Sequence, residues 1–402
     1  MLKAVRSVVR LRKFEFNGDK RRLAACGDLK DLRKLAKRNL PGGVFDYFDG
    51  AAEDEWSLAN NSAAFSKFGL VPKVLRDVSK IDTTTTIMGQ AVPFPIALSP
   101  TGFTRIAHPQ GELAVARVAG RNSLPFTLST LGTRSIEEVA AVATGPLWYQ
   151  LYVWRDRGLS RELVQRANAA GYKAIMVTVD TAVFGRRERD VRRGFTLPPK
   201  IGLETFIDGI RHPRWTFKFV TNEPITFSAV AGRKDVDGSQ AITLSDYVNS
   251  QFDPTLSWRD LDWIRQESGL PIMLKGIQCV DDAKQAASLG VDAIALSNHG
   301  GRQLDGSPAP IELLPSVIDA VGDAIEVLVD GGVRRGSDVV KACALGARAA
   351  MFGRPYLYGL GAAGELGVQW ALDHITSGIS RTMALIGETS IRGLRRESVV
   401  AR

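Results

Sequence analysis

The feature that most constrains the fold is a series of short apolar segments rich in β-branched residues. Along most of the chain they alternate with segments whose apolar residues have helical spacing. Eight segments are candidate strands, at residues 94–100, 125–130, 148–153, 174–180, 271–276, 293–298, 326–332 and 349–354. Helical spacing of apolar residues predicts helices between them, at 111–121, 135–143, 159–170, 281–289 and 337–345. Strands that alternate with helices form a parallel sheet, and eight such units close into a barrel. We therefore predict a (β/α)8 TIM barrel.

An open, doubly wound sheet is the alternative α/β fold. Gly359, Gly361 and Gly364 do spell the dinucleotide-binding pattern GxGxxG. These glycines follow the last candidate strand, however, so no further strand completes the βαβ unit that the pattern requires. Small residues for close packing at the opening of the final helix are the favoured explanation.

One connection is much longer than the others. The fourth and fifth candidate strands begin 97 residues apart, which predicts an insertion at about 195–257. A connection of this length is usually functional or mobile. Residues 200–220 mix aromatic and basic side chains, namely Phe206, Trp215, Phe217 and Phe219 with Lys200, Arg211, Arg214 and Lys218. That mixture is typical of a membrane interface, and a lid or a subunit contact is the alternative.

The positive charge of the chain lies in its N-terminal extension. The net charge is +9, and residues 1–38 alone carry 13 Lys and Arg against 4 Asp and Glu. The remainder is therefore neutral overall, which argues against a nucleic-acid groove on the main domain. We divide the chain into a basic arm at 1–28 and a barrel domain at 29–402. Leu2, Val5 and Val9 have the spacing of a helix on an anionic membrane, and a solvated tail is the alternative.

The same segment and the cysteines indicate the compartment. Arg6 and Arg10 interrupt any apolar signal-peptide core. Cys26, Cys279 and Cys343 are far apart and form no CxxC pair, so neither disulfides nor a zinc site is expected. We expect a cytoplasmic protein, with peripheral contact to the cytoplasmic face of the inner membrane as an open option.

Polar residues, together with glycines and one proline, stand at the ends of the candidate strands, where the active sites of such barrels lie. In chain order they are Pro100, Thr101, Gly102, Ser129, Gln150, Tyr152, Thr178, Asp180, Lys275, Ser297, Asn298, His299, Asp330, Gly331, Gly332, Gly353 and Arg354. A barrel without an active site would not need polar residues at the ends of all eight strands. Glycines in DGGVRRG at 330–336, together with Arg334 and Arg354, predict a phosphate site at the last two strands. Lys275 ends an apolar strand and needs an anionic partner, which a reduced flavin would supply.

His299 is the candidate base. The chain has four histidines, and only this one ends a candidate strand, within SNHGGRQLDG at 297–306. Arg302 lies three residues later, and a base beside a guanidinium suits a substrate with an acidic proton and a carboxylate. Ser297 as a hydrolase nucleophile is disfavoured, because no GxSxG elbow surrounds it.

SNHGGRQLDG and DGGVRRG resemble the signature of the FMN-dependent 2-hydroxy acid oxidases and dehydrogenases, which include glycolate oxidase, mandelate dehydrogenase and flavin lactate dehydrogenases. The resemblance runs from about Leu29 to the C-terminal helix and includes FDYFDGAAEDE at 45–55, PTGFTR at 100–105 and TVDTAVFGRRERD at 178–190. It implies FMN bound by Pro100, Thr101, Gly102, Ser129, Gln150, Tyr152, Thr178, Lys275, Ser297, Asp330, Gly331, Gly332, Val333, Arg334, Gly353 and Arg354.

The resemblance also implies a substrate site made of Tyr47, Tyr152, Arg187, His299 and Arg302. Arg187 and Arg302 would bind the carboxylate, with a hydrogen bond from Tyr47, and Tyr152 would contact the reacting hydroxyl. Asp180 would pair with His299 and stabilise the imidazolium that forms when the base takes a proton. Whether that proton leaves oxygen (hydride transfer) or carbon (a carbanion) stays open at this point.

Two departures from the family pattern and one further resemblance bear on the subtype. Gly102 stands where many oxidases of the family have alanine, Leu131 stands where glycolate oxidase has tryptophan, and HPRW at 212–215 resembles mandelate and bacterial lactate dehydrogenases. We expect a homo-oligomeric L-lactate dehydrogenase that passes electrons to a quinone-type acceptor. An oxidase that makes hydrogen peroxide, a mandelate-type dehydrogenase and a barrel that binds FMN without redox turnover are the alternatives.

Overall fold

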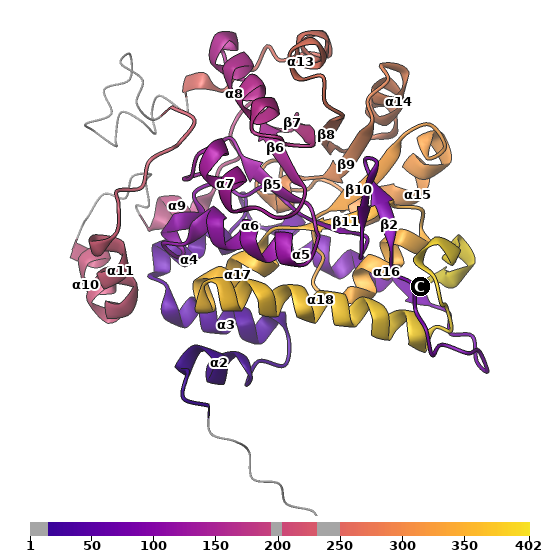
Figure 1. Ribbon diagram of the computed structural model, residues 1–402, viewed down its shortest axis with the longest axis horizontal. Coiled ribbons are helices and arrows are strands. Elements are labelled where there is room, and N and C mark those ends of the chain that lie inside the picture. Colours follow the sequence, from indigo (N-terminus) through magenta and orange to yellow (C-terminus); the bar gives the residue numbers. More distant parts are fainter. Residues whose placement is uncertain (1–14, 194–202, 231–249) are drawn as a thin grey trace, which may run out of the picture.

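The computed structural model describes residues 15–193, 203–230 and 250–402. Within these ranges eight parallel strands form a closed barrel in the order β10-β11-β4-β5-β6-β7-β8-β9 (Figure 1). The strands are β4 Ile96–Leu98, β5 Phe126–Ser129, β6 Leu147–Leu151, β7 Ala174–Thr178, β8 Ile272–Ile277, β9 Ala293–Ser297, β10 Glu326–Asp330 and β11 Ala349–Phe352. Each predicted strand is present, although most end earlier than predicted because their polar last residues belong to the loops.

Helices surround the barrel, as the periodicity predicted. They are α6 Gly111–Arg121, α7 Ile136–Val142, α8 Arg157–Ala169, α13 Asp260–Ser268, α14 Val280–Ser288, α15 Pro310–Val321, α16 Gly336–Ala344, α17 Arg354–Ala363 and α18 Glu365–Leu385. Gly359 and Gly361 lie in α17 and Gly364 precedes α18. A Cβ on Gly359 would stand 2.3 Å from the carbonyl oxygen of Gly367. The GxGxxG pattern therefore serves helix packing, as inferred, between α17 and the opening of the final long helix, α18.

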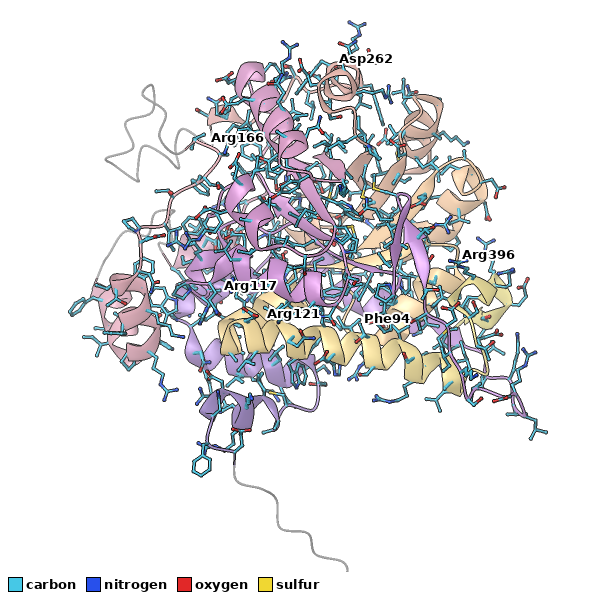
Figure 2. The ribbon with its side chains drawn as sticks, in the orientation of Figure 1. Phe94, Arg117, Arg121, Arg166, Asp262 and Arg396 are labelled. Atoms are coloured by element: carbon cyan, nitrogen blue, oxygen red, sulfur yellow. The ribbon has the colours of Figure 1, made fainter. Side chains whose placement is uncertain are left out.

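Ion pairs join neighbouring outer helices. Arg166 on α8 lies 2.9 Å from Glu137 on α7, and Arg117 and Arg121 on α6 both contact Glu365 on α18 (Figure 2). These side chains are partly exposed, so each pair adds at most about 1 kcal/mol. The apolar layer between the helices and the strands is therefore the main stabilising contribution.

A β-hairpin closes the bottom of the barrel. β2 Thr85–Ile87 pairs with β3 Gln90–Val92, in a segment where the sequence pattern predicts no strand. Ile87 and Val92 are buried in one cluster with Trp148 and Met273 from the barrel interior. The four threonines and nearby prolines obscured the alternation of a strand, and tertiary burial of Ile87 and Val92 decides the structure.

Four short helices precede the barrel; the first two contact the outer helices α17 and α18, and the last contacts the turn at His299–Gly301 at the C-terminal end of the barrel. They are α2 Gly18–Leu23, α3 Leu29–Asn39, α4 Gly42–Asp49 and α5 Trp56–Ala63. Beyond them β1 Phe68–Leu70 pairs with β12 Val399–Ala401 at the other end of the chain. The helix expected from Leu2 to Val9 lies outside the described residues.

The insertion after β7 contains α9 Glu188–Arg192 and a pair of helices, α10 Leu203–Arg211 and α11 Pro213–Thr221, which project from one side of the molecule (Figure 1). Phe206, Ile210, Phe217 and Val220 on this pair are 60 to 73% exposed. Trp215 faces inward instead and donates a hydrogen bond to the carbonyl of Ile106 at 2.8 Å. In the described part of the chain, no helix is long and apolar enough to cross a membrane.

Candidate active site

The C-terminal ends of the strands open into a cavity of about 1080 Å³, part of it open to solvent. Most residues predicted for the site line this cavity: Tyr47, Pro100, Thr101, Gly102, Ser129, Tyr152, Arg187, Lys275, His299, Arg302, Asp330, Gly331, Gly332, Val333, Arg334, Gly353 and Arg354. Parallel strands place their carboxyl ends on one rim, which explains why residues more than 250 positions apart meet here.

His299, Asp180 and Tyr152 form a hydrogen-bonded group in the wall. The Nδ1 atom of His299 lies 3.0 Å from Oδ1 of Asp180, and Nε2 lies 3.4 Å from the hydroxyl of Tyr152. Burial raises the pKa of Tyr152, and the Asp180 charge adds to the effect, so the phenol stays protonated. The imidazole is therefore held between a carboxylate and a hydroxyl donor, which is an arrangement that suits a proton acceptor.

Local backbone geometry places the base. His299 follows β9 and has a positive φ of 56°, an uncommon conformation for a residue with a side chain. The hydroxyl of Ser297 accepts a hydrogen bond from the His299 amide at 3.1 Å, and Asn298 accepts one from Gly301 at 3.1 Å. These two bonds stabilise the turn that directs the imidazole toward the cavity.

A glycine makes room for the partner of the base. Gly276 lies at an irregularity in β8 with φ 113°, and a Cβ there would stand 2.7 Å from Asp180. Any other residue would therefore displace the Asp180 carboxylate. The Oδ2 atom of Asp180 is buried and has no hydrogen-bond partner among the described residues.

Arg302 is a partly buried cation whose hydrogen-bond acceptors among the described residues are carbonyl groups. Its Nη1 atom donates to the carbonyl oxygens of Tyr47 at 2.7 Å and Gly50 at 3.0 Å. Its guanidinium also lies 5.2 Å from the centre of the Tyr47 ring, and that of Arg187 lies 5.9 Å from the same ring. Burial lowers the pKa of Arg302 to about 9, and the Arg187 charge contributes. Two like charges thus face one space, which an anion would stabilise.

Lys275 already has a protein partner, which corrects the expectation that a flavin must supply its anion. Its Nζ lies 2.9 Å from Oδ2 of Asp330 and donates to Ser297 at 3.0 Å. Ser99 donates to the other oxygen of Asp330 at 2.6 Å. Burial by itself would lower the pKa of Lys275, but the Asp330 and Asp180 carboxylates hold that pKa above its usual value. The ammonium therefore remains charged in the cavity wall.

Gln150, Thr178 and Ser297 are buried beneath the cavity rather than in its lining. The amide of Gln150 donates to Thr178 at 3.0 Å and accepts from Ser129 at 3.0 Å. This chain of bonds fixes the ends of β5, β6 and β7 relative to one another. Of the residues predicted to contact FMN, these three are placed one layer further from the open space.

The last two strands end in backbone that is open to the cavity. Gly331 and Gly332 have φ values of 127° and 80°, and α17 begins at Arg354, so its N-terminal end lies at the cavity wall. A helix N-terminus beside glycines is suited to an anion such as a phosphate. The guanidinium of Arg354, which the sequence pattern placed at the phosphate site, donates its hydrogen bonds to the carbonyls of Phe48, Gly300 and Gly50.

Some lining residues were missed. Gln303 donates to the carbonyls of Asp180 at 2.9 Å and Val183 at 2.8 Å, and its position inside SNHGGRQLDG was the available signal. Phe252, near the far end of the insertion, packs against Tyr152 at 5.0 Å and Phe184 at 4.2 Å between ring centres. No local pattern marks Phe252, because its role depends on how the insertion returns to the barrel.

A family model for FMN-dependent dehydrogenases matches residues 36–401. The chain belongs to the FMN-dependent dehydrogenase family. It is 46% identical to a candidate L-lactate dehydrogenase of Mycobacterium tuberculosis, over 94% of this chain and 90% of that protein. It is 41% identical to glycolate oxidase of Spinacia oleracea, over 93% of this chain and 95% of that protein. These relatives establish an FMN-dependent 2-hydroxy acid oxidoreductase.

Among solved structures, the chain resembles the monotopic membrane protein (S)-mandelate dehydrogenase. The TM-score is 0.90 at 36% identity, over 94% of this chain and all of that chain. The three relatives differ in substrate, so family membership gives the FMN cofactor and the reaction class but not the particular hydroxy acid.

The cavity fits FMN, the cofactor of the family. The glycine turn after β10 and the N-terminus of α17 suit its phosphate, and the charged Lys275 in the same wall suits an electron-rich ring. The residues that would hold the phosphate are those of the Gly331–Arg334 turn, Gly353 and the backbone of Arg354. His299 and Arg302 line the same cavity and remain available to a substrate.

Proposed function

We propose that this enzyme oxidises a small L-2-hydroxy acid, with L-lactate as the preferred substrate and pyruvate as the product. One observation carries the proposal. Arg302 is partly buried, has no ion pair to any described carboxylate, and opens on the same cavity as the His299–Asp180 pair. A partly buried cation beside a base needs a ligand that has both a carboxylate and a removable proton.

In this proposal the protein binds the substrate and moves its proton. Arg187 and Arg302 bind the carboxylate through charge-assisted hydrogen bonds, and Tyr47 packs beside both guanidinium groups. His299 takes the proton at Nε2, while Asp180 fixes the ring through Nδ1 and stabilises the resulting imidazolium. The hydroxyl of Tyr152 donates a hydrogen bond to the reacting oxygen of the substrate. FMN, when bound, supplies the acceptor for two electrons.

The wall of the cavity supports a small substrate. Leu131 and Phe184 line it, and Gly102 lies so close to Leu131 that a Cβ on the glycine would stand 2.9 Å from the Leu131 Cβ. An aliphatic wall suits a methyl group. A mandelate-type substrate is the second candidate, because Phe184 and the adjoining Phe252 offer aromatic contact.

We further propose a quinone-type acceptor at a membrane surface. The exposed apolar side chains of α10 and α11, beside Arg211 and Arg214, support peripheral contact with an anionic bilayer. A soluble oxidase that transfers electrons to oxygen is the alternative, and the insertion is then a lid or a subunit contact.

The decisive experiment is anaerobic reduction of the purified holoenzyme by a panel of L- and D-2-hydroxy acids, followed by reoxidation with oxygen or a short-chain quinone. Flavin absorbance reports both half-reactions. We expect the fastest reduction with L-lactate and faster reoxidation by the quinone. Failure of every hydroxy acid to bleach the flavin would refute the function, whereas preferred reduction by L-mandelate would change only the substrate. Light scattering of the same sample tests the expected homo-oligomer.

Membrane contact has its own test. We expect the protein to sediment with vesicles that contain phosphatidylglycerol at low salt, because each basic residue near an anionic surface contributes up to about 1 kcal/mol. Deletion of residues 203–240 should make release by salt easier while turnover with soluble acceptors survives. If the intact protein ignores vesicles, the soluble oxidase is favoured.

A further inference from the structure

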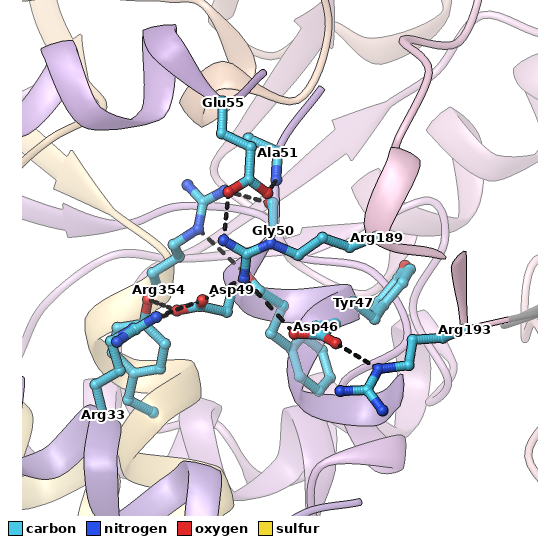
Figure 3. Close-up of polar contacts among 12 residues, drawn as sticks. Arg33, Asp46, Tyr47, Asp49, Gly50, Ala51, Glu55, Arg189, Arg193 and Arg354 are labelled. Atoms are coloured by element: carbon cyan, nitrogen blue, oxygen red, sulfur yellow. Dashed lines mark hydrogen bonds and ion pairs between the residues drawn. The ribbon is translucent and has the colours of Figure 1, made fainter. Parts of the chain in front are cut away.

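Arg189 lies two residues after the proposed substrate ligand Arg187, and it contacts acidic side chains rather than the cavity. Its Nη1 is 2.9 Å from Oδ2 of Asp49 and 3.6 Å from Oδ1 of Asp46, and its Nη2 pairs with Glu55 (Figure 3). Asp46 and Asp49 belong to α4, and Glu55 immediately precedes α5. One guanidinium of α9 therefore holds both ends of the α4–α5 connection.

The connection is fixed from a second side as well. Asp49, only 3% exposed, accepts hydrogen bonds from Arg33 on α3 at 2.6 Å and from the hydroxyl of Tyr358 on α17 at 2.9 Å. Burial alone would raise the pKa of Asp49, but Arg33, Tyr358 and Arg189 hold it below its usual value. Asp49 is therefore an ionised anchor, and Arg189 joins α9 to that anchor.

The opposite side of the connection faces the cavity and holds the site arginines. The carbonyl of Gly50 accepts hydrogen bonds from both Arg302 at 3.0 Å and Arg354 at 2.8 Å. Space at Gly50 is tight, since a Cβ there would stand 2.7 Å from the Asp46 carbonyl and 3.4 Å from Cδ of Arg189. A shift of the Arg189 side chain would therefore move the carbonyl that orients Arg302.

We propose that Arg189 is a positioning residue for the substrate carboxylate. It sets the distance between α9, which carries Arg187, and α4, which carries Tyr47 and precedes the Gly50 carbonyl. It acts through these groups and does not itself contact the substrate. The proposal rests on the proposed function, because it assumes that Arg187 and Arg302 bind a carboxylate.

The charges support a positioning role over simple surface pairing. Arg187 and Arg354 both repel Arg302 in the cavity wall, and Asp49 and Glu55 are among the groups that stabilise the charge of Arg354. Without Arg189, Glu55 has no other described ion pair, and Asp49 keeps Arg33. Glu55 would then lose its link to α9 and keep the hydrogen bond from the Ala51 amide at 2.9 Å, while Asp49 stayed fixed by Arg33, which predicts a local change in geometry rather than unfolding.

The test compares Arg189→Met with Arg192→Met in the holoenzyme. Arg192 belongs to the same helix, has a 71% exposed side chain and, among the described residues, forms an ion pair with Glu188 alone, so its replacement is a matched control. For Arg189→Met we expect KM for the 2-hydroxy acid to rise about tenfold, the scale of one weakened charge-assisted contact, with normal FMN content. KM for the corresponding uncharged 2-hydroxy amide should change less than about twofold, because the carboxylate contact is the one affected. Arg189→Lys should give an intermediate KM.

A cycle with Arg187→Met separates the possible explanations. If Arg189 acts through the carboxylate ligands, adding Arg189→Met to Arg187→Met should raise KM by less than about twofold further. Equal losses for acid and amide, or additive losses in the cycle, would overturn the positioning role. Loss of FMN or of thermal stability in Arg189→Met would also overturn it and assign a structural role. Wild-type enzyme assayed beside the variants reports separately on the proposed function, since its failure to reduce with any hydroxy acid would refute that function first.

Discussion

Lys275 and Arg302 line one cavity, the first buried and the second partly buried, and the protein compensates their charges differently. Lys275 has a carboxylate partner, Asp330, at 2.9 Å, and that carboxylate is itself bound by Ser99 and Ser297. Arg302 receives two carbonyl oxygens and, in the described part of the chain, no ion pair to a carboxylate. The charge of Lys275 is therefore compensated by a carboxylate of the protein, whereas that of Arg302 has no carboxylate partner among the described residues.

The difference teaches how to separate structure from ligand binding among buried charges. An internally paired charge is fixed whether or not a ligand is present. A guanidinium left with carbonyl dipoles alone costs stability in the empty protein and recovers it when an anion binds. We therefore regard the Lys275 side of the cavity as a preformed wall for the cofactor, and the Arg302 side as the place where a substrate anion completes the structure.

The largest expected effect is at the base on the substrate side. His299→Gln should slow flavin reduction by roughly 10²–10⁴-fold, because the proton acceptor is lost while the Gly331–Arg334 turn is untouched. FMN content should stay normal. Stopped-flow reduction measures the rate, with His374→Gln on α18 as the control. A near-normal rate would remove His299 from the chemistry.

The next effect tests the paired cation. Lys275→Met leaves Asp330 buried without its counter-charge, so the free energy of unfolding should fall by about 3–5 kcal/mol. Urea unfolding of apoprotein and holoprotein measures this, and Lys284→Met, exposed on α14, is the control. The double variant Lys275→Met with Asp330→Asn should recover part of the loss. A fall below about 1 kcal/mol in the single variant would contradict internal pairing.

A smaller effect is expected at the unpaired cation. Arg302→Met should weaken transition-state binding by roughly 1.5–3 kcal/mol in kcat/KM, the scale of a hydrogen bond to a charged group. Arg187→Met should behave alike. In contrast to Lys275→Met, the Arg302→Met apoprotein should lose little stability, because no described carboxylate loses an ion-pair partner, whereas Arg187→Met also removes the Arg187–Asp190 pair at 3.9 Å. Destabilisation as large as that of Lys275→Met would erase the distinction between the two cations.

Much of the barrel could be predicted from the sequence because its signals are local. Apolar runs such as Ala174–Thr178 alternate with segments of helical spacing, and glycine and proline residues separate the two kinds of segment. The convergence of their polar ends then follows from the topology of a parallel barrel. His299 was predicted because its motif is compact, with base, glycines and arginine within a few positions. The hairpin β2–β3 was missed because its residues lack alternation and gain their burial only from the barrel interior.

The sequence by itself predicted the eight barrel strands and the family signature and pointed to His299 as the candidate base, since each depends on neighbours along the chain. Only the tertiary structure decided how the charges are paired. The partner of Lys275 lies on β10, the carbonyls that hold Arg302 come from Tyr47 and Gly50, and Arg189 meets Glu55 across 134 positions. Electrostatic compensation depends on distances of a few ångströms between groups far apart in sequence, and no local pattern specifies those distances.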